Sequence, residues 1–102
     1  MGLLDMLGLS NKSENIQDYV AKGAVIIDVR SNGEFASGHI KGSKNIPLDT
    51  IATKIQEIKK LNKPVIACCR SGMRSAQATS ILKQNGIDTI NGGGWDSLQN
   101  KL

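Results

Sequence analysis

A cysteine directly followed by a loop with two arginines is the feature of this sequence best suited to chemistry. Cys69 ends an apolar run that begins at Val65, and Arg70 and Arg74 follow it closely. They are two of only three arginines in a chain whose positive charge is carried mostly by lysine. Guanidinium groups and the amino end of a following helix stabilise a thiolate relative to a thiol. We therefore predict a lowered pKa for Cys69, whose thiolate would act as a nucleophile.

The segment after Cys69 has the composition of an anion-binding loop. Gly72 can adopt a positive φ, which allows successive backbone N–H groups to converge on one point. Arginine adds a planar fork of donors that matches oxyanions better than the ammonium group of lysine. The predicted substrate-binding residues are Arg70, Ser71, Gly72, Met73, Arg74 and Ser75.

The second cysteine, Cys68, precedes Cys69 directly. Neighbouring side chains on a strand point to opposite faces, so a disulfide between these two residues would be strained. Two thiols without nearby histidines do not make a zinc site either, and we expect no metal. Cys68 is therefore expected to be a buried core thiol, and this use of cysteine fits a reducing, cytoplasmic compartment.

The segments around these cysteines alternate between strand and helix patterns. Apolar runs predict strands at 24–29, 45–47, 64–68 and 87–90. Helical spacing predicts helices at 13–20 with Ser13 as N-cap, at 31–35, 48–61, 74–84 and 95–102, with a glycine turn at 91–94. This order predicts an α/β fold with a central parallel sheet and helices on both faces. In such sheets ligands bind beyond the carboxyl ends of the strands, where we expect Cys69.

Asp28 and Arg30 stand at the end of the first long strand and could border the same site. Glu34 follows in the next turn, so an Arg30–Glu34 ion pair that holds this turn is the alternative. We favour a structural role near the site for Asp28 and Arg30. His39, the single histidine, is expected to be structural as well.

The chain has 102 residues and a formal net charge of +4, which fits one basic domain at 13–102. Residues 1–12 are expected to form an extension, most simply a short helix. The lysines are scattered and no aromatic pair offers a stacking surface, so we expect no nucleic-acid binding. No apolar run approaches the ~18 residues of a membrane span, and we expect no stable membrane insertion.

Several segments in the right order resemble the rhodanese family. They are Val25-Ile26-Ile27-Asp28-Val29-Arg30, Glu34-Phe35-Ala36-Ser37-Gly38-His39-Ile40, Asn45-Ile46-Pro47, Cys69-Arg70-Ser71-Gly72-Met73-Arg74-Ser75 and Gly92-Gly93-Gly94-Trp95. The resemblance covers roughly residues 15–102. It implies a single-domain sulfurtransferase with no cofactor.

The resemblance also implies a mechanism for the loop. Cys69 would take sulfane sulfur from thiosulfate or a persulfide, become a persulfide, and pass the outer sulfur to cyanide or a thiol. Glutathione, thioredoxin or a protein thiol would serve as the thiol acceptor. Backbone N–H groups of residues 70–74 would stabilise the persulfide anion, and the Arg70 and Arg74 side chains would orient an anionic donor.

Other functions remain alternatives to a sulfurtransferase. Related phosphatases and arsenate reductases use a Cys-x5-Arg loop around a tetrahedral oxyanion, whereas Cys69 and Arg74 are separated by one residue fewer. A persulfide carrier and a non-catalytic interaction module are two further alternatives. A thiol redox protein is disfavoured because the chain has no Cys-x-x-Cys motif.

Overall fold

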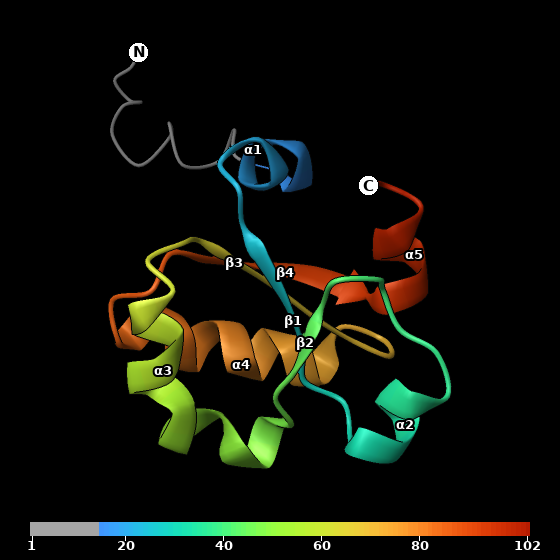
Figure 1. The fold of residues 1–102 in the computed structure, drawn as a ribbon, viewed down its shortest axis with the longest axis horizontal. Helices are drawn as coiled ribbons and strands as arrows, with labels where there is room; N and C mark the ends of the chain where they lie inside the picture. The colour runs from blue at the N-terminus through green and yellow to red at the C-terminus, as the bar shows by residue number, and fades with distance from the viewer. Residues whose placement is uncertain (1–14) are drawn as a thin grey trace.

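The structure of the protein is a computed structural model that describes residues 15–102 (Figure 1). A four-stranded, all-parallel sheet in the order β2–β1–β3–β4 lies between two layers of helices. The strands are β1 (Val25–Asp28), β2 (Lys44–Asn45), β3 (Val65–Cys69) and β4 (Thr89–Gly94). The helices are α1 (Ile16–Ala21), α2 (Asn32–Ala36), η3 (Leu48–Lys54), α3 (Ile55–Lys60), α4 (Met73–Gln84) and α5 (Trp95–Gln99). The predicted α/β fold is confirmed, and the expected extension at 1–12 lies outside the described residues.

Two apolar clusters hold the helices to opposite faces of the sheet. The larger cluster joins η3, α3 and α4 to one face and includes Ile27, Ile51, Ile58, Val65 and Leu82. The smaller cluster joins α1 and α5 to the other face and includes Ile16, Tyr19, Ile66 and Leu98. Because both faces are covered, every residue of β3 is buried, which explains its uninterrupted apolar sequence.

Strand alternation separates the two cysteines as predicted. Cys69 packs in the larger cluster, on the α4 side of the sheet, and Cys68 packs in the smaller cluster. Both thiols are free. Cys68 is fully buried, and this burial raises the pKa of its thiol to about 12.

The helical segment at 48–61 differs from the single α-helix that its apolar spacing predicts. Its first half, η3, is a 3-10 helix, and only the second half, α3, is α-helical. The hydroxyl of Thr50 donates to the carbonyl of Pro47, and that of Thr53 donates to the carbonyl of Thr50. These bonds over three residues compete with the α-helical pattern, which accounts for the tighter winding.

The first helix also begins later than predicted. Its N-cap is Asn15, whose side chain accepts the backbone N–H of Asp18, while Asp18 accepts the N–H of Asn15 in return. This capping box satisfies two helix donors and fixes the start at Ile16. The predicted cap, Ser13, lies outside the described residues.

The glycine run at 92–94 continues β4 instead of forming the predicted turn. Ala67 pairs with Asn91, but Cys68 pairs with Gly93, so one extra residue of β4 forms a bulge beside β3. A Cβ atom on Gly92 would lie 2.8 Å from Ile66 Cγ2. Gly92 is therefore needed because β4 passes closer to its neighbours there than a side chain allows, while Gly93 meets no atom within 4 Å but has a φ of +81°.

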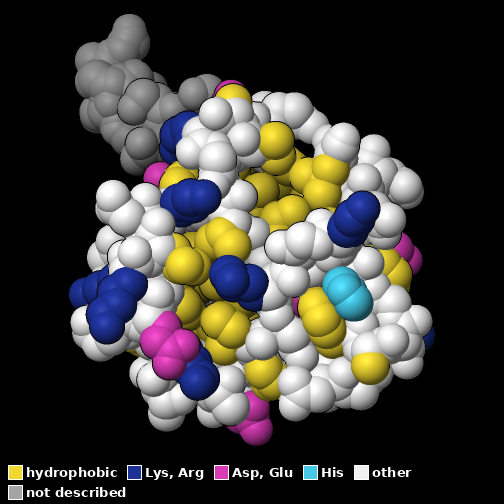
Figure 2. All heavy atoms as spheres, viewed as in Figure 1, with side chains coloured by type: hydrophobic (Ala, Val, Ile, Leu, Met, Phe, Trp, Pro, Cys, Tyr) yellow, Lys and Arg dark blue, Asp and Glu magenta, His cyan; other side chains and the backbone are white. Residues whose placement is uncertain are grey.

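The surface agrees with the absence of a basic run in the sequence. On the face shown in Figure 2, lysine and arginine side chains are dispersed among hydrophobic and polar atoms. None of the helices in residues 15–102 is long and apolar enough to cross a membrane.

Candidate active site

The sulfur atom of Cys69 lies at the carboxyl end of β3, within reach of donors from the following loop. The backbone N–H of Gly72 donates to Sγ at 3.0 Å and that of Ser75 at 3.4 Å, and Ser75 Oγ lies 3.3 Å from Sγ. Gly72 has a φ of +100°, the left-handed conformation that turns the chain into α4. The predicted convergence of loop N–H groups on the cysteine is present.

The surroundings of Cys69 set the pKa of its thiol. Burial raises this pKa, but hydrogen bonds from the Ser75 side chain and from the backbone of Ser75, Gly72 and Ser71 lower it by more. The net pKa lies below the ordinary value, which confirms the predicted direction. The main cause of the lowering is hydrogen bonding within the loop rather than the arginine charges.

Asn91 on β4 is a residue of this site that sequence reasoning missed. Its Oδ1 accepts the Ser75 hydroxyl at 2.7 Å and the N–H of Gly93 at 2.9 Å. Its Nδ2 donates to the carbonyl of Gly72 at 3.1 Å. Asn91 thus ties the loop to the neighbouring strand. Asn91 pairs with Ala67 in β3, whereas the sequence predicted a turn at this position, so the contact was not expected.

The two loop arginines differ in their contacts. Arg74 forms a two-pronged ion pair with Glu34 of α2, with N···O distances of 2.8 and 3.0 Å. The hydrogen bond from Arg74, followed by the N–H of Ser31, lowers the pKa of Glu34 to about 2. The predicted Arg30–Glu34 pair is therefore wrong. Arg70 is exposed, and its guanidinium makes no hydrogen bond or ion pair within residues 15–102.

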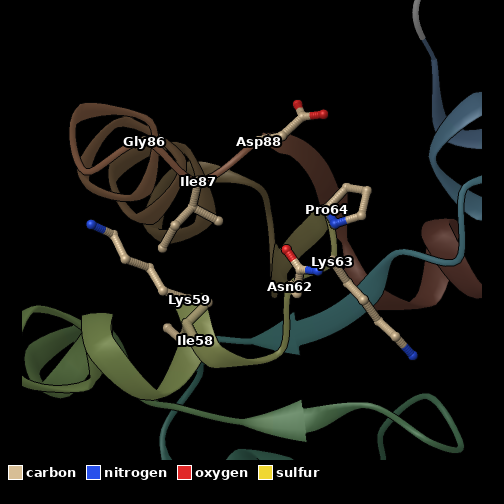
Figure 3. Close-up of a pocket in the computed structure, with 8 residues that line it drawn as sticks. All are labelled: Ile58, Lys59, Asn62, Lys63, Pro64, Gly86, Ile87 and Asp88. Atoms are coloured by element: carbon tan, nitrogen blue, oxygen red, sulfur yellow. The ribbon is translucent and has the colours of Figure 1, made fainter.

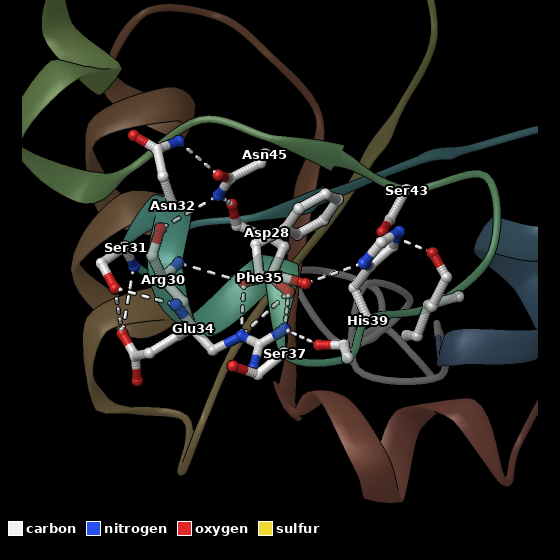
Figure 4. A network of polar contacts seen from close by, with 12 residues as sticks. Asp28, Arg30, Ser31, Asn32, Glu34, Phe35, Ser37, His39, Ser43 and Asn45 are labelled. Atoms are coloured by element: carbon white, nitrogen blue, oxygen red, sulfur yellow. Dashed lines mark hydrogen bonds and ion pairs between the residues drawn. The ribbon is translucent and has the colours of Figure 1, made fainter.

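Arg30 pairs instead with Asp28, and the two side chains are almost completely buried (Figure 4). Arg30 Nη2 lies 2.7 Å from Asp28 Oδ2 and donates at 2.7 Å to the carbonyl of Gly38. Its guanidinium also lies 4.8 Å from the centre of the Trp95 ring. This pair joins the end of β1 to the segment after α2 and to α5. A structural role for both residues stays a prediction.

The side chains of the remaining loop and motif residues make no hydrogen bond with the Cys69 sulfur in the described part of the chain. Ser71 and Met73 are exposed, and Met73 is the most exposed large hydrophobic residue among residues 15–102, at 75%. His39 stacks on Phe35 with ring centres 3.7 Å apart, and its Nδ1 bonds the Phe35 carbonyl at 2.8 Å. His39 has no contact with Cys69, as expected for a structural histidine.

Two cavities flank the loop at the carboxyl end of the sheet. The Arg70 cavity, of about 360 Å³, is lined by Arg30, Glu34, Ser37, Arg70, Trp95 and Asp96. The Leu48 cavity, of about 350 Å³, is lined by Val29, Ser31, Pro47, Leu48, Asp49 and Arg74. The two loop arginines therefore face different cavities, with the Arg74–Glu34 pair between them.

A third cavity, of about 280 Å³, lies at the opposite end of the sheet (Figure 3). It is bordered by Pro64, just before β3, and by the turn at Gly86–Asp88, and Lys63 extends away from it. Its position at the amino ends of the strands separates it from the Cys69 loop.

Comparison with known proteins agrees with this geometry. The rhodanese-like domain model matches residues 12–101. A protein named sulfurtransferase from Allochromatium vinosum is 32% identical over 87 residues, which cover 85% of this chain and 76% of the relative. The uncharacterized protein YqhL of Bacillus subtilis is 42% identical over 67 residues, which cover 66% of this chain and only 52% of that protein.

The other relatives are named for two different activities. Some are named thiosulfate sulfurtransferase GlpE, as in Pseudomonas fluorescens, and others tRNA uridine(34) hydroxylase, of which the match covers about a quarter. Among solved structures, a rhodanese-like domain protein from Staphylococcus aureus superposes with a TM-score of 0.67 at 32% identity, over 93% of this chain and 85% of that one. The sequence match, the parallel sheet and the cysteine loop together assign this chain to the rhodanese family.

Proposed function

We propose that this protein is a sulfurtransferase that carries sulfane sulfur as a persulfide on Cys69. The observation that supports this most is the convergence of the Gly72 and Ser75 N–H groups and the Ser75 hydroxyl on one sulfur atom. These donors favour the thiolate, which is the nucleophilic form of cysteine. In the persulfide the negative charge lies on the outer sulfur, one bond beyond Sγ, where backbone N–H groups of residues 70–74 would be its donors.

In the first step, the Cys69 thiolate attacks the outer sulfur of an anionic donor. With thiosulfate, the bond between the two donor sulfurs breaks, sulfite leaves with the electron pair, and Cys69 becomes a persulfide anion. Arg70 is the loop guanidinium without a carboxylate partner in the described chain, so it is the better placed of the two arginines to attract the donor.

In the second step, an acceptor thiolate attacks the outer sulfur of the Cys69 persulfide. The sulfur–sulfur bond to Cys69 breaks, the Cys69 thiolate is released, and the acceptor leaves as a persulfide. No metal, cofactor or external reductant enters either step. Candidate acceptors are glutathione, thioredoxin or another protein thiol, and cyanide would serve as an assay acceptor.

The decisive experiment follows sulfur on the protein itself. After incubation with thiosulfate, glutathione persulfide or mercaptopyruvate, mass spectrometry of the intact chain should show the addition of one sulfur atom. This adduct should persist in Cys68→Ser and disappear in Cys69→Ser. Equal turnover by wild type and Cys69→Ser, or an adduct confined to Cys68, would contradict the proposal.

The same experiment separates an enzyme from a carrier. An enzyme turns over repeatedly with a small donor and a small thiol, whereas a carrier forms the persulfide but releases it only to a protein acceptor. A pure interaction module forms no adduct with any of the three donors.

A further inference from the structure

The Arg70 cavity contains two charged side chains that the rest of the described chain leaves uncompensated. Arg30 is neutralised by Asp28, and Glu34 is bound on both oxygens by Arg74. Of the four charged residues that line the cavity, Arg70 and Asp96 then remain. These two have opposite signs.

Neither remaining charge has an ionic partner. The Arg70 guanidinium makes no ion pair within residues 15–102, and the Asp96 carboxylate accepts only the backbone N–H of Ser97, at 2.9 Å. The two residues lie close in the fold, because an added Cβ on Gly94 would lie 2.7 Å from the carbonyl oxygen of Arg70 and 3.3 Å from Asp96 Oδ1. Both therefore border the same end of β4.

The cavity lies next to the end of β3 in the chain and in the sheet, although Cys69 itself does not line it. Arg70 follows Cys69 directly, and Cys69 pairs with Gly94, which precedes Trp95 and Asp96. A molecule in the Arg70 cavity is thus held beside the loop that contains Sγ. A dianion such as thiosulfate meets Arg70 there but is repelled by Asp96, whereas a molecule with charges of both signs complements both side chains.

We infer that the thiol acceptor is an amino-acid thiol, whose carboxylate binds Arg70 and whose ammonium group binds Asp96 in the Arg70 cavity. This inference rests on the proposed function and specifies its acceptor. The transfer is the second step given above: the acceptor thiolate bonds to the outer persulfide sulfur, and the Cys69 thiolate leaves. The product is the persulfide of the amino-acid thiol.

Four small thiols test the inference, because they carry both, one or neither of these two charges. Cysteine carries both groups, cysteamine the ammonium, 3-mercaptopropionate the carboxylate, and 2-mercaptoethanol neither. Wild-type protein is first loaded with thiosulfate, and the Cys69 persulfide is verified by mass spectrometry. Transfer rates are then measured for each thiol and expressed per thiolate, because the four thiols ionise at different pH values.

Cysteine should react fastest, and removal of either charge should reduce the rate by about fivefold, the range of one solvent-accessible ion pair.

Asp96→Asn should slow cysteine and cysteamine by the same factor, without slowing 3-mercaptopropionate or 2-mercaptoethanol. It should also accelerate loading by thiosulfate, because a negative charge near the donor is removed. Asp49→Asn, which makes the same charge change in the Leu48 cavity, should leave the preference among thiols unchanged.

The outcomes separate this inference from the proposed function. Failure to form any Cys69 persulfide would overturn both. A persulfide that passes to all four thiols at equal rates would overturn the acceptor inference alone. An Asp96→Asn variant that slows all four thiols and the loading step equally would also overturn it, because that pattern reports a structural defect.

Discussion

The Ser75 hydroxyl has one proton and two neighbours that can accept it. Asn91 Oδ1 lies 2.7 Å from Ser75 Oγ, and Cys69 Sγ lies 3.3 Å away. When Cys69 is a thiol, its S–H can donate to Ser75 while Ser75 donates to Asn91. When Cys69 is a thiolate, the Ser75 hydroxyl can donate to it only by giving up the bond to Asn91, whereas the Ser75 N–H donates to it in either case. Asn91 therefore influences the ionisation of a sulfur atom that it does not touch.

Replacement of Asn91 by aspartate should raise the pKa of the Cys69 thiol. A carboxylate competes more strongly for the Ser75 proton and adds a negative charge near the thiolate. The rate of alkylation by iodoacetamide, measured against pH in a Cys68→Ser background, should show its midpoint moved upward. In the parent protein the midpoint should lie below that of a free thiol, about 8.5.

Asn85→Asp is the matched control for this charge change. Asn85 follows the far end of α4, more than three helical turns from the loop, so the alkylation midpoint should stay in place. A midpoint that moves downward in Asn91→Asp, or moves equally in both variants, would exclude competition for the Ser75 proton.

Single residues were predictable where their chemistry is local. The position of Cys69 and the positive φ of Gly72 depend on neighbours in the sequence, and both agree with prediction. Asn91 and the Arg74–Glu34 pair depend on contacts across 16 and 40 residues. Such contacts follow from packing, which a single sequence does not reveal.

At the scale of elements, the Arg74–Glu34 pair connects α4 to α2 near the loop. Because the pKa of Glu34 is lowered from 4.5 to about 2, its ionised form stabilises the folded state. This contribution is complete above about pH 4.5 and is lost as the pH falls toward 2. The free energy of unfolding, measured by urea denaturation across this range, should therefore fall with pH in wild type more steeply than in Glu34→Gln.

Glu57→Gln provides the comparison for Glu34→Gln. Glu57 lies on an exposed surface and contacts Lys54 at 3.5 Å, so its loss should leave the wild-type pH dependence nearly intact. Identical pH dependence in wild type and Glu34→Gln would show that the pair between α2 and α4 does not contribute to acid stability.

The close approach of β4 to the loop gives a prediction for stability. Gly94→Ala places a Cβ atom 2.7 Å from the Arg70 carbonyl, so either the loop or the strand must move. We expect a loss of about 1–3 kcal/mol in the free energy of unfolding, typical of overpacking. Persulfide formation should slow as well, because the displaced residue is next to Cys69.

Gly33→Ala is the control for Gly94→Ala. Gly33 lies in α2, and an added Cβ there meets no atom within 4 Å. This change should be neutral or stabilise by up to about 1 kcal/mol, because alanine is the better helix residue. If Gly94→Ala unfolds at the same urea concentration as Gly33→Ala, β4 has room that the structure does not indicate.

Element types were largely predictable, and their irregularities were not. Strand–helix alternation identified all four strands, and the Ser31 capping box fits the predicted short helix at 31–35. The 3-10 winding of η3 depends on threonine hydroxyl bonds, and the extension of β4 through three glycines depends on its register with β3. Glycine is more typical of turns than of strands, which is why residues 91–94 were predicted as a turn.

For the whole molecule, the sheet is a barrier between the two thiols. Both cysteines are buried, but Cys68 is enclosed by the cluster under α1 and α5, whereas the Cys69 sulfur lies against the loop that follows it. In Cys69→Ser, labelling of Cys68 by a disulfide reagent should therefore require opening of the sheet and proceed at the rate of global unfolding. In Cys68→Ser, labelling of Cys69 should require only loop motion and be much faster.

Urea tests this difference between the two thiols. Low urea should raise the logarithm of the Cys68 labelling rate in proportion to the fall in the free energy of unfolding, and should affect Cys69 far less. Equal labelling rates at the two positions in native buffer would contradict the separation of the thiols by the sheet.

The bulge in β4 also makes the length of the glycine run significant. Side chains alternate along a strand, so deletion of one glycine from 92–94 would shift the chain after it by one position against β3. Trp95 would then lose its place over Arg30, and Asp96 its place in the Arg70 cavity. We expect insertion or deletion of a glycine in this run to be more damaging than substitution of one. In a library of insertions and deletions, this short segment should be among the least permissive parts of the chain, although glycine runs are usually tolerant of such changes.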